Sequence, residues 1–425
     1  MLCAWAWAWH LKDPHLRFLR EEELPLLLAA LCAAAAIAWR SARGARRVVA
    51  LALVVGATLT ALGHELASRQ HRLEVNAASG PVAQALGARF IVGYDDANDL
   101  RELARRGLIG GIFVTGRNVK GRSADTLRAE IASLQALRLA AGLPPLVVAT
   151  DQEGGGVSRM SPPLPRPVTL GEIVRSHGNE NARREAARTY AANVGRSLSE
   201  LGVNLNFAPV VDLDQGVSNP NDRYSRISTR AISSDPKVVA DIAGEYCREL
   251  ALHGVHCTIK HFPGLGRVFE DTHLDHATLA TPADELARSD WLPFRELMQQ
   301  KSMFTMLAHV TLTAIDLERP ASFSAPVVSG LLRRDWKYDG ILVTDDFSMG
   351  AAYRSNGGLA AASVSALNAG VDLILISYDP DQYFPVVHAL LRADAKGALA
   401  REALERSNRR LQAVPAGQEA AVSAR

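Results

Sequence analysis

Four short stretches of the chain bring acidic, basic and imidazole side chains close together in sequence. They are Asp151-Gln152-Glu153, Lys260-His261, Asp271-Thr272-His273 and Asp345-Asp346. Such residues can supply a nucleophile and a group that donates and accepts a proton. Asp275 and His276 form a second aspartate–histidine pair, and spacing alone does not rank the two pairs. Taken singly, each residue also has a structural explanation, because an aspartate often caps a helix and a histidine can be satisfied in the core.

Eight short β-rich runs, separated by longer segments with helical periodicity, follow residue 78. This alternation is typical of parallel βαβ units. The runs are 89–92, 111–114, 146–150, 204–210, 255–260, 304–308, 341–344 and 373–376. An open doubly wound sheet has the same alternation, but the count of eight favours a closed (β/α)8 barrel, an α/β fold. We place this single domain at about residues 75–412 and expect residues 413–425 to form a loose tail.

Two helices between these strands have clear boundaries. One helical pattern covers residues 187–201 and ends at Gly202. Another begins with Asp235 as its cap and Pro236 in its first turn, and stops at Gly254. Both patterns predict helices that pack outside the barrel.

The carboxyl ends of the predicted strands carry most of the chemically active side chains. The third run leads to Asp151, the fifth to Lys260 and His261, the sixth to His309 and the seventh to Asp345. In a (β/α)8 barrel the strand ends and the loops after them form the active site. Because a purely structural barrel has little reason to desolvate both signs of charge at one mouth, we interpret this set as functional.

The most specific string in the chain is residues 260–266, KHFPGLG, followed by Asp271-Thr272-His273. It resembles the K-H-F-P-G-x-G and D-[ST]-H elements of family 3 glycoside hydrolases, specifically the single-domain β-N-acetylglucosaminidases (β-N-acetylhexosaminidases) of bacterial peptidoglycan recycling. Residues 151–155 (DQEGG), 206–212 (NFAPVVD) and 344–349 (TDDFSM) match further motifs of that family in the same order. The resemblance covers residues 92–376 and implies a barrel that removes terminal β-linked N-acetylglucosamine.

The resemblance implies catalytic roles for three residues. Retaining hydrolysis of a β-glycoside needs a carboxylate under the anomeric carbon and a proton donor for the departing oxygen. Asp345 matches the family's nucleophile, whereas Asp346 is expected to point the other way and brace the loop. His273 matches the family's unusual acid/base on a mobile loop, paired with Asp271.

The same resemblance implies five contacts to the sugar and its acetamido group: Asp151, Arg159, Arg230, Lys260 and His261. Charged side chains that are held rigidly suit these polar groups. The choice of Arg230 follows from aligning residues 230–236, RAISSDP, with the family's R-S-F-S-x-D-P pattern, and Arg223 and Arg226 are the alternatives.

Two positions depart from the family's motifs. Gly156 stands where an arginine is common, and Leu265 replaces the usual histidine of P-G-H-G. Neither position is the predicted nucleophile or part of the acid/base pair. We therefore expect them to affect the preference for what lies beyond the terminal sugar, not the type of reaction.

Other functions on the same fold stay open. A histidine acid/base leaves room for phosphate in place of water, which gives a glycoside phosphorylase. A barrel without turnover would be a non-catalytic cell-wall glycan-binding module, although such a module has no evident need for Asp345, Asp271 and His273 together. β-Glucosidase activity in this family usually comes with a further domain after the barrel, for which the sequence leaves no room.

Residues 1–74 are expected to anchor the chain in a membrane. Two apolar runs, at about 24–39 and 48–63, flank a link that carries Arg40, Arg43, Arg46 and Arg47. Each run is slightly shorter than the roughly 20 residues that span a bilayer, so an interfacial position or a cleaved signal is an alternative to a membrane hairpin. The positive-inside rule keeps the link in the cytoplasm and places the barrel on the periplasmic side of a bacterial inner membrane, with the cytoplasmic side as the alternative. This anchor departs from the family's soluble recycling enzymes.

Composition excludes several other partners. Lysine and arginine total 47 against 45 acidic residues, a net charge of +2, and no basic tract favours nucleic acid. The four cysteines, Cys3, Cys32, Cys247 and Cys257, lack metal-ligand spacing, so we expect neither zinc nor a disulfide. No glycine-rich nucleotide loop follows the first strand. We expect a monomer that needs no cofactor.

Overall fold

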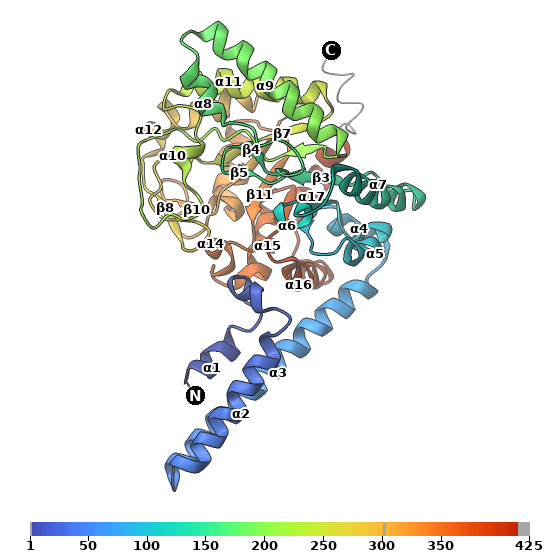
Figure 1. Cartoon of the computed structure of the whole chain (residues 1–425), viewed down its shortest axis with the longest axis vertical. Coiled ribbons are helices and arrows are strands. Elements are labelled where there is room, and N and C mark those ends of the chain that lie inside the picture. The colour runs from blue at the N-terminus through green and yellow to red at the C-terminus, as the bar shows by residue number, and fades with distance from the viewer. Residues whose placement is uncertain (1, 301–302, 415–425) are drawn as a thin grey trace. The chain divides into compact units, whose positions relative to one another are not determined.

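The structure, a computed structural model, describes residues 2–300 and 303–414 (Figure 1). The chain divides into two compact units, Met1–Ala78 and Ser79–Arg425. Each unit is described by itself. Most of the predicted tail, residues 415–425, lies outside the described residues.

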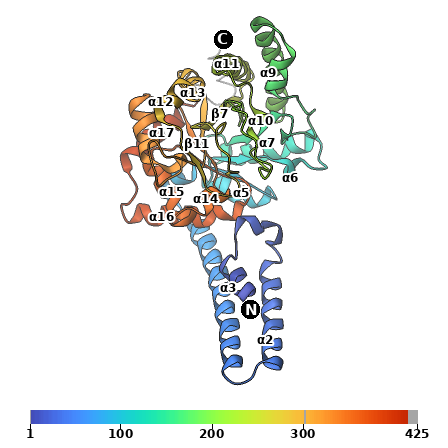
Figure 2. The same ribbon diagram turned by 90° about the vertical axis from the view of Figure 1, so that its left-hand side faces the viewer.

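Eight parallel strands of the second unit, of which β7 and β11 are labelled in Figure 2, close into a barrel in the order β1-β12-β11-β9-β7-β6-β3-β2. They are β1 (Phe90–Gly93), β2 (Gly111–Phe113), β3 (Val147–Thr150), β6 (Leu205–Asn206), β7 (His256–Phe262), β9 (Phe304–Leu307), β11 (Leu342–Asp346) and β12 (Leu373–Ile376). Each lies within or overlaps one of the eight predicted runs, so the predicted (β/α)8 barrel is confirmed. The fourth strand is much shorter than its predicted run.

The interior of the barrel is filled by apolar side chains. Ile91, Phe207, Met306 and Leu375 are among the buried residues of this core. The rings of Phe113 and Phe207 stack there with their centroids 5.7 Å apart. Because the barrel is a packed core and not a pore, polar side chains of the strands gather at its ends.

Helices cover the outside of the barrel, as the alternating pattern predicted (Figure 1). The α-helices are α4 (Gly80–Gly87), α5 (Asn98–Arg106), α6 (Gly116–Val119), α7 (Ala124–Ala140), α8 (Leu170–Ser176), α9 (Glu180–Glu200), α10 (Ile227–Arg230), α11 (Pro236–Leu252), α12 (Ala283–Arg288), α13 (Trp291–Leu297), α14 (Gly350–Tyr353), α15 (Gly358–Ala369), α16 (Tyr383–Ala395) and α17 (Arg401–Gln412). A π-helix, η3, covers Pro326–Asp335, and the 3-10 helices η2 and η4 cover Ala321–Phe323 and Pro380–Gln382. The Asp235 side chain accepts a hydrogen bond from the backbone of Lys237, which confirms the predicted cap.

Two small sheets lie in the loops after the barrel strands. β4 (Gln152–Gly154) and β5 (Val157–Ser158) form an antiparallel pair directly after β3. β8 (Ala277–Leu279) pairs in parallel with β10 (Val310–Leu312), which follows β9. These sheets stabilise the long loops on which much of the candidate site lies.

The expectation of no disulfide is wrong. Cys247 of α11 and Cys257 of β7 form a disulfide bond, and both residues are buried. The two cysteines lie on consecutive elements, and only the packing of α11 against β7 brings them together, which their spacing does not reveal. Cys3 and Cys32 are free and exposed.

The first unit is helical. It contains α1 (Leu2–Trp9), the 3-10 helix η1 (Pro14–Leu19), α2 (Glu23–Ser41) and α3 (Ala45–Ala77). The two predicted apolar runs lie within α2 and α3, and both helices are long and apolar enough to cross a membrane, each with a window of mean hydropathy 1.7. The three α-helices meet through a small core of Ala8, Leu11, Leu27, Leu31, Ala57 and Ala61. The short helix α1 was not predicted.

Candidate active site

Asp345 lies at the carboxyl end of β11, at the mouth of the barrel. Burial by itself raises the pKa of its carboxyl group, but interactions with the neighbouring imidazoles of His261, His309 and His273, and with the backbone N–H of Asp346, outweigh this effect and lower it below its ordinary value. The carboxylate also accepts the backbone N–H of Asp346 at 2.8 Å. Asp345 is therefore an ionised carboxylate surrounded by imidazoles.

Asp346 faces away from this group and braces the neighbouring loops, as expected. Its carboxylate accepts hydrogen bonds from the backbone N–H groups of Ser348, Ser377 and Tyr378 at 2.8–3.0 Å, and from the Ser377 hydroxyl at 2.5 Å. These contacts join the ends of β11 and β12. Asp346 is thus a structural residue that holds the strand end carrying Asp345.

A buried cluster of opposite charges lies at the same mouth. Lys260 Nζ is 2.7 Å from Asp151 Oδ1 and 2.6 Å from Glu153 Oε1. Arg230 donates two hydrogen bonds to the Glu153 carboxylate, at 2.8 and 2.7 Å. Burial lowers the pKa of Lys260, yet Asp151 and Glu153 more than offset it and raise the pKa above its ordinary value. Both cations therefore stay charged.

His261 is oriented by Asp212 and contacts this cluster. Its Nδ1 lies 2.7 Å from Asp212 Oδ2, and Asp212 also accepts the backbone N–H of His261 and of Leu265. Arg230 Nη2 lies 3.3 Å from His261 Nε2. The bond to Asp212 places the proton on Nδ1, so Nε2 accepts from Arg230.

The predicted sugar contacts are not all brought together. Asp151, Arg230, Lys260 and His261 form one connected group. Arg159, after the β4–β5 hairpin, donates its backbone N–H to the carbonyl of Asp151 at 2.9 Å, but its side chain is exposed and shares no hydrogen bond with the others among the described residues. Of the three candidate arginines, only Arg230 lies in the cluster, because Arg223 and Arg226 are exposed.

Asp271 and His273 form a hydrogen-bonded pair on the loop after β7. His273 Nδ1 is 2.9 Å from Asp271 Oδ1. Burial raises the pKa of Asp271, but the hydrogen bonds and charge of His273, with the backbone N–H of Tyr224, lower it well below its ordinary value. Asp271 has 5% of its side chain exposed against 37% for His273. The aspartate is thus a fixed anion that orients a solvent-accessible imidazole.

The alternative pair does not form. Asp275 and His276 are both exposed, and Asp275 lies 3.6 Å from Arg354. No hydrogen bond joins the two side chains in the described part of the chain. The structure therefore favours Asp271 and His273 as the interacting pair.

The loop that carries His273 is docked against the loop after β11. The backbone N–H of Gly350 donates to the carbonyl of His273 at 2.8 Å, and that of Ala351 to the carbonyl of Thr272 at 3.3 Å. A Cβ atom at Gly350 would collide with the carbonyl of Leu274. The absence of a side chain at position 350 thus allows the close approach of the two loops.

Three residues that structure this site were given no specific role from the sequence: Glu153 and His309 were counted only among the polar residues at strand ends, and Asp212 only as part of a motif. Glu153 lies in the DQEGG motif and Asp212 in the NFAPVVD motif, and membership of these motifs was the sequence signal that could have identified them. His309 is buried, donates from Nε2 to the Asp346 carbonyl at 3.0 Å, and lies 2.7 Å from the Ser322 hydroxyl through Nδ1. Burial lowers its pKa, so it is a neutral imidazole beside Asp345.

Metal ligation finds no support in the described residues. Across residues 2–300 and 303–414, no group of three or more His, Cys, Asp or Glu side chains is placed to hold an ion. The chemistry available at the mouth is that of a carboxylate, an oriented imidazole and fixed charges. A barrel with these parts belongs to the class of (β/α)8 glycosidases.

Comparison with known proteins identifies the family within this class. Residues 76–414 match the glycosyl hydrolase family 3 N-terminal domain, so the chain belongs to this family and is a glycosidase. It is 32% identical to a β-hexosaminidase of Xanthomonas euvesicatoria pv. vesicatoria (strain 85-10) over 290 residues, which cover 68% of this chain and 82% of that protein.

Two solved structures have the same architecture. A family 3 β-N-acetylglucosaminidase of Paenibacillus sp. str. FPU-7 superimposes with a TM-score of 0.72 at 31% identity, covering 81% of this chain and 64% of that one. A family 3 glycosyl hydrolase of Mycobacterium smegmatis str. MC2 155 gives a TM-score of 0.69 at 32% identity, covering 80% and 98%. The similarity therefore extends over the whole barrel.

Proposed function

We propose that the protein is a retaining glycosidase that removes terminal, non-reducing β-linked N-acetylglucosamine from cell-wall-derived glycans. The observation that carries this proposal is the position of Asp345 at the end of β11, at the same mouth of the barrel as the hydrogen-bonded Asp271–His273 pair. The substrate class is supported by relatives named β-hexosaminidase and β-N-acetylglucosaminidase.

In the first step, Asp345 attacks the anomeric carbon while His273 gives a proton to the departing glycosidic oxygen. The glycosidic bond breaks and a covalent glycosyl-enzyme forms. In the second step, His273 takes a proton from water, whose oxygen attacks the anomeric carbon and releases Asp345. Because the bond to Asp271 keeps a proton on His273 Nδ1, the proton that moves is the one on Nε2.

Asp151, Arg230, Lys260 and His261 bind the terminal sugar in this proposal, since they form one rigid, charged group at the mouth. Arg159 completes the set by turning its exposed guanidinium toward the bound sugar. Fixed, charged hydrogen-bond partners of this kind orient hydroxyl and acetamido groups.

We further propose that the chain acts as a monomer anchored in the inner membrane, with the barrel in the periplasm. Two helices of sufficient length and hydropathy support the anchor. The arginine-rich link between them supports a cytoplasmic position for that link. The Cys247–Cys257 disulfide supports an oxidising compartment for the barrel, because disulfides are rare in the cytosol.

The test uses the full-length chain in detergent with the p-nitrophenyl β-glycosides of N-acetylglucosamine and glucose. We expect cleavage of the acetamido sugar alone, loss of kcat by roughly 10⁴-fold or more in Asp345→Asn, and a slowly turned-over glycosyl-enzyme in His273→Ala. Adding phosphate should release no sugar phosphate. A wild-type chain that cleaves neither substrate, with or without phosphate, would leave a binding module as the better interpretation.

A further inference from the structure

Tyr224 lies beside the imidazole of His273, although the two residues belong to different loops. Their ring centroids are 5.4 Å apart and the ring planes are inclined by 42°. Tyr224 is 54% exposed, so much of its apolar face is open to solvent and adds little to the stability of the fold. An exposed aromatic ring next to the acid/base of a glycosidase has a position that suits contact with a ligand.

Hydrogen bonds to Asp271 fix the backbone around Tyr224. The N–H groups of Arg223 and Tyr224 both donate to Asp271 Oδ2 at 3.1 Å. The hydroxyl of Ser225 donates to Asp271 Oδ1 at 3.1 Å and lies 3.4 Å from His273 Nδ1. The turn that carries Tyr224 is therefore attached to the same carboxylate that orients His273.

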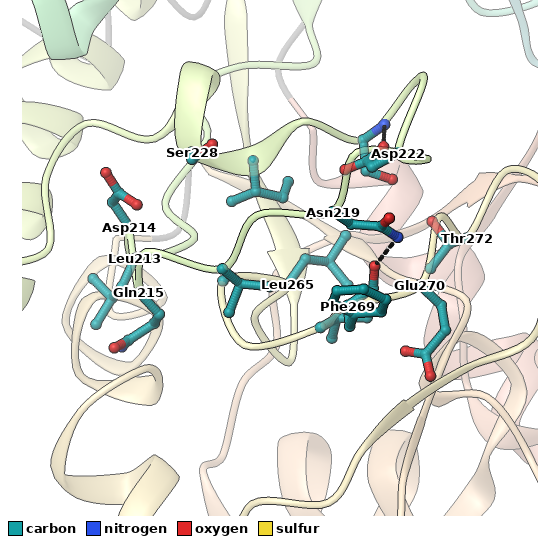
Figure 3. Close-up of a pocket in the computed structure, with 15 residues that line it drawn as sticks. Leu213, Asp214, Gln215, Asn219, Asp222, Ser228, Leu265, Phe269, Glu270 and Thr272 are labelled. Atoms are coloured by element: carbon teal, nitrogen blue, oxygen red, sulfur yellow. Dashed lines mark hydrogen bonds between the residues drawn. The ribbon is translucent and has the colours of Figure 1, made fainter.

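The turn is also closed on itself and joined to the His273 loop a second time. The Asp222 carboxylate accepts the backbone N–H groups of residues 224–226 at 2.7–3.2 Å. Asn219 Nδ2 donates to the carbonyl of Phe269 at 2.7 Å, and Figure 3 shows this bond between the two segments. None of these bonds involves the Tyr224 side chain, so replacing that side chain leaves all of them in place.

In the mechanism proposed above, His273 gives its proton to the oxygen of the departing group. That oxygen must lie within hydrogen-bond reach of the imidazole, so the rest of the leaving group lies next to the rings that flank His273. We propose that Tyr224 forms one wall of the leaving-group site and helps to determine which aglycones are cleaved. The ligand that fits is a pyranose or aryl ring that stacks its apolar face on the tyrosine. This inference rests on the proposed role of His273.

The experiment compares two leaving groups in the full-length chain. N,N′-diacetylchitobiose releases a sugar that reaches Tyr224, whereas β-N-acetylglucosaminyl fluoride releases a single atom that does not. We expect Tyr224→Ala to lower the ratio of kcat/KM for the disaccharide over the fluoride by about tenfold or more. Tyr224→Phe keeps the aromatic face and should keep this ratio within about twofold of wild type.

Phe269→Ala is the matched control. Phe269 is 56% exposed on the His273 loop but makes no ring contact with His273 in the described part of the chain. Its replacement should leave the ratio unchanged. An active Tyr224→Ala variant with an unchanged ratio, or with equal losses on both substrates, overturns this inference alone. A wild-type chain that cleaves neither substrate overturns the proposed function and this inference with it.

Discussion

Replacing Glu153 by glutamine tests how the charges at the mouth of the barrel are balanced. The Glu153 side chain is 5% exposed and lies 2.7 Å from Arg230 and 2.6 Å from Lys260. Glutamine keeps the shape but leaves two buried cations opposite one carboxylate, that of Asp151. Removing one partner of a buried ion pair costs about 3–5 kcal/mol, and 1 kcal/mol lowers the Tm of a large domain by about 2 °C. We therefore expect the Tm of Glu153→Gln to fall by about 6–10 °C.

Glu102 provides a matched control for this measurement. Its carboxylate also lies 2.7 Å from an arginine, Arg105, but its side chain is 57% exposed. Because water and salt screen an exposed pair, Glu102→Gln should leave the Tm unchanged. Scanning calorimetry of the full-length chain in detergent at neutral pH measures both shifts. Equal shifts in the two variants would refute the argument that burial decides the contribution of these ion pairs.

The histidines near Asp345, the bonds to Asp271 and the disulfide each predict a measurable response. Burial raises the pKa of Asp345, but its neighbours outweigh this effect and lower it, so the acid limb of kcat/KM should lie below the ordinary aspartate value of 3.8. The pKa of Asp271 is depressed, so this carboxylate adds stability that is present above its ordinary pKa of 3.8 and is lost as the pH falls further. Asp271→Asn should therefore lower the Tm at neutral pH, and the difference in Tm from the wild type should shrink in acid. Replacing both Cys247 and Cys257 by serine should cost about 2–3 kcal/mol, and dithiothreitol should lower the Tm of the wild type but not of this variant. An acid limb above pH 3.8, a Tm difference between Asp271→Asn and wild type that persists in acid, or a double serine variant that responds to dithiothreitol would contradict the respective argument.

Local patterns in the sequence were sufficient to predict the barrel. Strand runs and helix caps such as Asp235 depend on neighbouring residues, so they can be read without the fold. The gathering of Asp151, Lys260 and Asp345 at one mouth followed from the topology, because parallel strands of a barrel end on the same side. The catalytic roles of Asp345, Asp271 and His273 stay predictions.

Contacts between distant segments could not be predicted in the same way. The bidentate bond between Arg230 and Glu153 joins residues 77 positions apart, and the bond of Ser225 to Asp271 joins residues 46 apart. Neither partner's local sequence specifies the other. The disulfide escaped notice for the same reason, since it depends on how α11 packs against β7. The side chain of Arg159 was expected at the cluster, but Arg159 directly follows the β4–β5 hairpin and its side chain is exposed.

The contact between Gly350 and the His273 loop has a consequence for protein engineering. The His273 carbonyl is bound by a residue that belongs to the segment after β11, and this contact requires that position 350 carry no side chain. Transplanting residues 264–276 alone onto another barrel would therefore move the histidine without the surface that receives it. A working graft would have to include the segment from Phe347 to Arg354, and also the turn of residues 219–226 that is bonded to Asp271 and Phe269, so these three segments form a single exchangeable module.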